Sequence, residues 1–125
     1  MARHARHKLG LVPDGTLALV SAPEDLTLAI PTGVTIPDKG LVSVVVAFVT
    51  KQKALGAALT KALGRASDDG LLWVAYPKSG QQGTDLNRDI LARALSEKGL
   101  EAVSLVALDD VWSALRVRHA ADLAA

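Results

Sequence analysis

The sequence predicts an α/β domain with a three-layer arrangement, in which a mostly parallel sheet of five to six strands has an antiparallel last strand. Three observations lead to this fold class. Residues 41–49 and 71–75 are apolar on both faces, which is typical of strands that are covered on both sides. Each of these stretches is followed by an amphipathic segment. Only Asp109-Asp110 separates the last two apolar stretches, so these strands must be antiparallel neighbours.

The composition indicates one small domain without cysteine chemistry. A chain of 125 residues with 50% hydrophobic residues can bury one core. The absence of cysteine excludes disulfides, thiol catalysis and thiolate metal sites. No stretch approaches the roughly 20 apolar residues of a membrane span, and the apolar run at 9–12 is too short for a signal-peptide core. We therefore expect a cytoplasmic protein that does not enter a membrane.

The excess of positive charge comes from the N-terminus. Of the 14 Lys and Arg residues, three lie at positions 3, 6 and 8, so the rest of the chain has 11 basic and 13 acidic residues. The body of the protein therefore lacks the basic surface that nucleic-acid binding requires. We expect a mobile basic arm at residues 1–8, a single domain at 9–120 and a tail at 121–125.

The first half of the chain alternates between short elements. Residues 16–21 predict a strand, and residues 23–30 predict a short helix because proline and acidic residues open it and Pro31 follows. A brief strand is expected at 34–36. Only residues 37–40 connect it to the strand at 41–49, and four extended residues span about 13 Å. The brief strand is therefore frayed, misassigned or not parallel.

The second half reads as a regular alternation of helices and strands. Thr50 is expected to cap a helix whose apolar residues recur through 55–66, and residues 68–70 form a turn before the strand at 71–75. Thr84 or Asp85 is expected to cap the next helix. Its expected buried stripe is Leu86, Ile90, Leu91, Ala94 and Leu95.

The last elements are two strands at 103–108 and 112–118. Right-handed crossovers place both helices on the same face of the sheet, which leaves the second face to the segment at 23–30 and the N-terminal arm. Because this second face lacks full cover, we expect a homodimer that buries it. Arg116 is expected to pair with Asp85 or Asp89.

The order of elements resembles the class I methyltransferase branch of the Rossmann-like folds. Three motifs, WVAYPK at 73–78, TDL with Arg88-Asp89 at 84–89 and WSALR at 112–116, resemble a bacterial family that is known only as a domain of unknown function. The resemblance implies a reduced methyltransferase-like Rossmann fold and implies no activity. In that branch the turn after the first strand is usually rich in glycine, whereas here it reads SAPE. Asp38 could imitate the acid that holds a ribose.

A ligand site is expected at the carboxyl ends of the parallel strands, where ligands bind in open sheets. Lys78 lies beside the donor groups of the loop at 79–84 and the start of a helix, which suits an anion. The alternative is that Lys78 is solvated and the loop only connects two elements. Trp73 is expected in the core, and Trp112 either packs over the sheet or closes a pocket. The candidate ligand-binding residues are Thr50, Tyr76, Lys78, Ser79, Thr84 and Trp112.

No catalytic constellation can be assembled, because no nucleophile, base and orienting group occur together. His4 and His7 are spaced as metal ligands but lack a third partner. The sequence therefore favours a small non-catalytic module that binds a small anionic ligand or a protein partner. The alternatives are a methyltransferase that uses S-adenosylmethionine despite its glycine-less turn, and a purely structural or oligomeric interaction protein.

Overall fold

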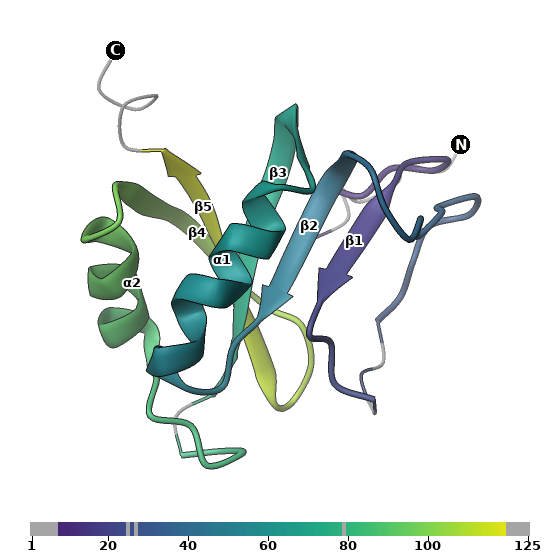
Figure 1. Cartoon of the computed structure of the whole chain (residues 1–125). Helices are drawn as coiled ribbons and strands as arrows, with labels where there is room; N and C mark the ends of the chain where they lie inside the picture. The colour runs from purple at the N-terminus through teal and green to yellow at the C-terminus, as the bar shows by residue number, and fades with distance from the viewer. Residues whose placement is uncertain (1–7, 25, 27, 79, 120–125) are drawn as a thin grey trace.

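The computed structural model describes residues 8–24, 26, 28–78 and 80–119 and contains one five-stranded sheet. The strands are β1 Leu17–Val20, β2 Val42–Phe48, β3 Ala66–Pro77, β4 Leu100–Ala107 and β5 Trp112–His119. Their order is β1-β2-β3-β5-β4. Strand β5 is antiparallel to both of its neighbours, whereas the other four strands share one direction (Figure 1). The predicted parallel sheet with an antiparallel last strand is confirmed.

The helices cover a single face of this sheet. A 3-10 turn, η1 Gln52–Ala54, leads into α1 Leu55–Leu63, and α2 is Arg88–Ser96. Leucines of both helices, Leu55, Leu59, Leu91 and Leu95, are buried in one core cluster with the strands (Figure 1). The prediction that both helices share a face is confirmed. Among the described residues, no helix is long and apolar enough to cross a membrane.

The second face of the sheet is covered by irregular segments instead of a helical layer. Leu9 and Leu11 are buried there, and Leu26 and Leu28 pack against the same cluster. The indole Nε1 of Trp73 donates a buried hydrogen bond of 3.0 Å to the carbonyl oxygen of Leu9. The expected three layers are therefore one layer of helices, the sheet and a layer of non-helical chain, and Trp73 is in the core as predicted.

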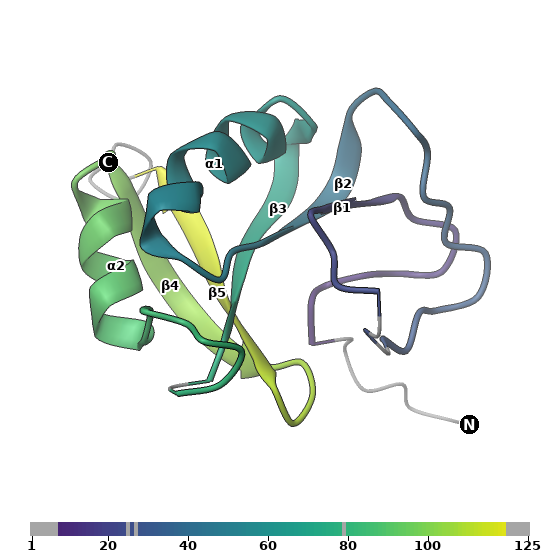
Figure 2. The same cartoon turned by 60° about the horizontal axis from the view of Figure 1, so that its bottom comes forward.

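The helix predicted at 23–30 is wrong for the described part of this segment. Residues 23, 24, 26 and 28–30 are not helical, and a hydrogen bond of 3.3 Å from the Leu26 amide to the Pro23 carbonyl marks a turn. Short isolated helices are not stable unless tertiary packing supports them. Here the leucines of the segment pack on the sheet as irregular chain. Figure 2 shows this long connection beside β1.

The strand predicted at 34–36 is reduced to one parallel bridge. Thr35 pairs with Thr16, and the amide of Leu17 donates to the Thr35 carbonyl at 3.0 Å. The link to β2 is held by Arg65, whose Nε donates to the Gly40 carbonyl at 2.6 Å and whose Nη2 donates to the Pro37 carbonyl at 2.9 Å. The segment thus forms one strand pair with the chain before β1, and the amide of Asp14 donates a further hydrogen bond of 3.0 Å to the Thr32 carbonyl.

Strand β3 begins earlier than the sequence suggests. Ala66 already pairs with Val42, and the next pairing joins Leu71 to Val44. The residues between these pairs bulge out, so the predicted turn at 68–70 lies inside the strand. Gly70 suits this bulge because a Cβ at its position would lie 3.0 Å from Ser67.

The second helix also begins later than predicted. Its N-cap is Asn87, whose Oδ1 accepts from the Ile90 amide at 2.8 Å, whereas the predicted caps Thr84 and Asp85 bond elsewhere. Leu86 is buried before the helix starts, and Ile90 is 38% exposed, so it does not belong to the buried stripe. Asn87 lies three residues after Thr84 and two after Asp85, so Leu86 precedes the helix, and Ile90 lies in the first turn at the flank of the buried side formed by Leu91, Ala94 and Leu95.

Arg116 lies on the face opposite α2. On β5, Leu115 and Val117 belong to the cluster under the helices, whereas Ala114 belongs to the second cluster. Because side chains alternate along a strand, Arg116 faces the same side as Ala114. The predicted pairing of Arg116 with Asp85 or Asp89 is therefore wrong.

Candidate functional site

The loop between β3 and α2 is fastened to the junction between β2 and α1. The hydroxyl of Thr84 donates to the Thr50 carbonyl at 2.6 Å and accepts from the Leu86 amide at 3.0 Å. The ammonium of Lys51 donates to the Gly83 carbonyl at 2.5 Å, and a carboxylate oxygen of Asp85 accepts from the Gln52 amide at 2.8 Å. The structure thus brings Thr50 and Thr84 together, and their contacts hold two connections of the chain in place.

Lys78 is bound by the turn between β4 and β5. Its ammonium donates to the Asp109 carbonyl at 2.9 Å, and its amide donates to the Val111 carbonyl at 2.7 Å. The side chain of Gln81 reaches the Asp110 carbonyl at 3.3 Å. The cation at Lys78 is therefore used by the protein itself, beside a turn that carries two acidic residues. Ser79 lies outside the described residues.

Tyr76 and Trp112 lie on opposite faces of the sheet. Tyr76 is 4% exposed in the cluster under the helices, and burial raises the pKa of its hydroxyl. Trp112 is 7% exposed in the second cluster and meets Phe48 edge to face, with ring centroids 5.2 Å apart and planes at 79°. Trp112 thus packs over the sheet, and the two aromatic residues do not line a common site.

A cleft of 370 Å³ lies at the carboxyl ends of β1 and β2, under the flank of α1. Thr50 is the predicted candidate that lines it, and three lysines contribute to its wall. None of the described lining residues is acidic. The lining is Ser21, Phe48, Thr50, Lys51, Lys53, Ala54, Ala57, Ala58 and Lys61.

The position of this cleft follows from the path of the chain. The chain leaves β1 toward the segment at Thr35, which bridges to Thr16 on one side, and then returns to β2 on the other side of β1. The order in which successive segments are added to the sheet therefore reverses at β1. Ligands of open parallel sheets bind in the crevice outside the strand ends at such a reversal. Ser21, which ends β1 at this point, has φ of +59° although it is not glycine. Such a backbone is uncommon for residues with a side chain and is frequent at functional sites.

The lysines of the cleft differ in whether their ammonium groups form hydrogen bonds with the chain. Lys51 is fastened to Gly83, as described above. Within the described part of the chain, the ammonium groups of Lys53 and Lys61 form no hydrogen bond or ion pair. Small alanines at 54, 57 and 58 leave space between the helix flank and the strand ends. The arrangement can therefore receive an anion without displacing a protein group from either lysine.

Sequence reasoning did not identify Lys53 and Lys61, because lysines on the outer side of an amphipathic helix are usually solvated. Lys53 lies in the 3-10 turn before α1 and Lys61 in the last turn of α1, so no single helical period relates the two and the sequence pattern gave no signal for them. Asp38, which the methyltransferase resemblance suggested as a ribose ligand, lies near Arg65 at the amino ends of the strands. It is thus remote from this cleft.

The described residues contain no group of three side chains suited to hold a metal ion, and His4 and His7 lie outside them. The family model described as "Protein of unknown function (DUF3052)" matches residues 36–121. The chain belongs to the DUF3052 family. The match covers β2 to β5 and both helices, so β1 and the segment before it lie outside the matched region.

Two further comparisons concern single proteins. No curated protein sequence matches this DUF3052 chain. Among solved structures, it is similar to a ribosomal protein L11 methylase from Lactobacillus delbrueckii subsp. bulgaricus, with a TM-score of 0.49 and 10% sequence identity. That similarity covers 86% of this chain and 70% of the other.

Proposed function

We propose that this protein is a small non-catalytic module that binds a small phosphate-bearing anion in the cleft between β1, β2 and α1. The observation that carries the proposal is a cleft at the reversal of strand order whose wall holds Lys51, Lys53 and Lys61 and no described acidic residue. Lysine is a common phosphate ligand because its ammonium acts as a compact charge with three donors.

The chemistry of the cleft supports binding over reaction. Lysine ammonium groups and the hydroxyl-bearing residues Ser21 and Thr50 can hold and orient an anion. A general base or nucleophile would need a partner that activates it, and the described lining offers none. Phe48 and the alanines give the cleft an apolar side against which the rest of a ligand can pack.

The proposal is tested first by a thermal-shift screen of the purified protein. Inorganic phosphate, nucleotides, acyl-coenzyme A, S-adenosylmethionine and S-adenosylhomocysteine are compared at constant ionic strength. Ligands that bind only the folded state raise its melting temperature, and we expect phosphate-bearing compounds to do so. A shift with the adenosyl compounds alone would overturn the proposal in favour of the methyltransferase reading.

The site is then located with matched lysine variants. In calorimetric titrations of the best phosphate compound, the double variant Lys53→Ala/Lys61→Ala is expected to bind about tenfold more weakly or worse. Lys39→Ala, an exposed lysine before β2 and so at the amino end of that strand, is the control and should bind as the wild type does. Equal affinity of the double variant and the wild type, or a screen without any shift, would overturn the proposal.

A further inference from the structure

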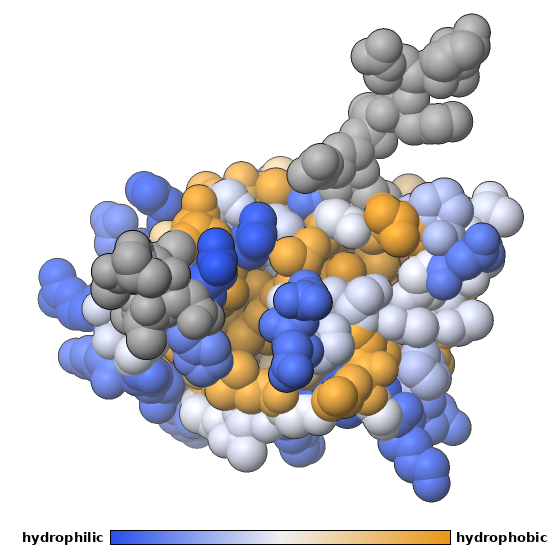
Figure 3. All heavy atoms as spheres, turned by 90° about the horizontal axis from the view of Figure 1, so that it is seen from above, coloured by the Kyte–Doolittle hydropathy of each residue, from blue (hydrophilic) through white to orange (hydrophobic). Residues whose placement is uncertain are grey.

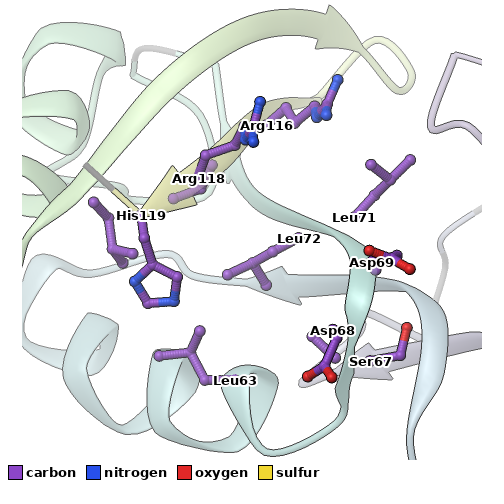
Figure 4. A pocket seen from close by; sticks show the side chains of 13 residues that line it. Leu63, Ser67, Asp68, Asp69, Leu71, Leu72, Arg116, Arg118 and His119 are labelled. Carbon is purple, nitrogen blue, oxygen red and sulfur yellow. The ribbon is translucent and has the colours of Figure 1, made fainter. Parts of the chain in front are cut away.

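A second cleft lies at the opposite ends of the strands, where the start of β3 and the end of β5 separate. These strands pair from Leu72 with Val117 to Pro77 with Trp112. Beyond that point Arg118 and His119 pair only with β4, while the start of β3 turns to β2. The strands thus spread apart and enclose a cleft of 510 Å³, which Figure 4 shows from close by.

Charged residues of opposite sign lie on opposite sides of this cleft. Arg116 and Arg118 extend from β5, whereas Asp68 and Asp69 stand on the bulge of β3 (Figure 4). Within the described part of the chain, none of these four side chains forms a hydrogen bond or an ion pair. Charges of both signs are therefore held near one another without neutralising each other directly.

Arg116 gives the strongest indication of a missing partner. Its Nε is buried and has no hydrogen-bond partner. A buried donor that stays unsatisfied costs about 1–3 kcal/mol, and more when the group is charged. Such a group calls for an explanation. The Nε itself has no exposed surface, but the residue as a whole is half-buried and lines the cleft, so an acceptor that enters the cleft meets the rest of the guanidinium. A carboxylate fits best, because it accepts from a guanidinium in a planar, two-bond arrangement.

Part of the lining between the charged walls is apolar. Leu63 is exposed and Leu71 is half-buried, whereas Leu72 and Leu100 are buried beneath the lining. Figure 3, which views this end of the strands, shows hydrophobic residues within a hollow that hydrophilic residues flank. A volume of 510 Å³ lies in the range of small-molecule sites. The ligand should therefore carry an apolar body between its two charged ends.

We propose that this cleft binds a zwitterion of amino-acid size with an apolar side chain. Its carboxylate pairs with Arg116 and Arg118, its ammonium pairs with Asp68 and Asp69, and its side chain packs on Leu63 and Leu71. The site is separate from the lysine cleft, since the two lie at opposite ends of the parallel strands.

Isothermal titration calorimetry of the full chain tests this proposal with three probes. L-phenylalanine carries both charges, N-acetyl-L-phenylalanine lacks the ammonium, and L-phenylalaninamide lacks the carboxylate. We expect L-phenylalanine to bind and each analogue to bind about tenfold more weakly or worse, because each leaves one charged wall without its partner. Equal binding of the three probes, or no binding of L-phenylalanine at millimolar concentration, would overturn the proposal.

Variants locate the two ends of the ligand. Arg116→Gln should weaken the binding of L-phenylalanine about tenfold but leave the binding of the amide, which has no carboxylate, unchanged. Asp69→Asn should weaken the binding of L-phenylalanine but leave the binding of the N-acetyl compound, which has no ammonium, unchanged. Arg118→Gln repeats the first test at an exposed position, in case Arg116→Gln lowers the melting temperature. Arg93→Gln, which is exposed on α2, is the control. Unchanged affinity for L-phenylalanine in both arginine variants would contradict the proposal.

Discussion

Tyr76 stands at the end of β3, where a ligand was expected, but its side chain is enclosed by the core. It is 4% exposed and lies near the start of α2. Burial raises the pKa of its hydroxyl, while Arg88 acts to lower that pKa and Asp89 to raise it. Because desolvation disfavours the phenolate, Tyr76 stays neutral at physiological pH and contributes packing, with no tendency to act as a base.

The raised pKa of Tyr76 predicts a pH dependence of stability. In the unfolded chain tyrosine ionises near pH 10, whereas the folded protein retains the proton to higher pH. Its contribution is therefore fully present below about pH 10 and is lost as pH rises through the folded-state pKa. We expect the urea midpoint of the wild type to fall more steeply between about pH 9 and 11 than that of Tyr76→Phe. Parallel profiles of the two proteins would contradict this assignment.

At the scale of elements, α2 depends on a cap that the sequence did not single out. The side chain of Asn87 accepts from the Ile90 amide at 2.8 Å. Asn87→Ala should lower the free energy of unfolding by about 1 kcal/mol, because it leaves that amide without a side-chain acceptor. Asn87→Asp is the control, since aspartate caps as well as asparagine. Urea denaturation measures both, and equal stability of the two variants would show that the cap does not matter.

The strands were predictable because their signal is local. The apolar runs of β2 and β3 allow few other structures, and the link at 109–110 permits only antiparallel pairing. The segment at 23–30 misled because its prolines and acids are helix signals, whereas its leucines pack as irregular chain on the sheet. The residues at 68–70 do change the direction of the chain, as their sequence suggests, but they form a bulge within β3. Ala66 before the bulge and Leu71 after it both pair with β2.

The candidate site was predictable only to the level of the sheet edge. The path of the chain brings Thr50 to the cleft, as the rule for parallel sheets implies. The same rule could not distinguish Lys78, which binds a carbonyl of the chain, from Lys53 and Lys61, which do not bind the chain. That distinction depends on which segment lies next to each lysine, and such tertiary contacts leave no periodic pattern in the sequence.

At the scale of the whole molecule, the second face of the sheet is covered from within the chain. Leu9 and Leu11 are 0% and 3% exposed, and the Leu9 carbonyl accepts from Trp73. Lys8 donates to the Ala107 carbonyl at 2.6 Å, so the contact begins at the first described residue. The homodimer prediction rested on incomplete cover of this face. The described segments supply much of that cover, and the oligomeric state stays a prediction for light scattering to test.

This covering segment predicts different results for two truncations. Removing residues 1–11 deletes Leu9 and Leu11, whose burial is worth about 1.5–3 kcal/mol each, and exposes Trp73. We expect a loss of several kcal/mol in the free energy of unfolding, a red shift of tryptophan emission, and self-association by light scattering as the apolar face becomes accessible. Removing residues 1–7 is the control and retains every contact described here. If both truncations match the full chain in stability, emission and mass, the segment at 8–11 is not part of the folded core. A full chain that is already dimeric would instead place the partner on a surface other than the one that Leu9 and Leu11 cover.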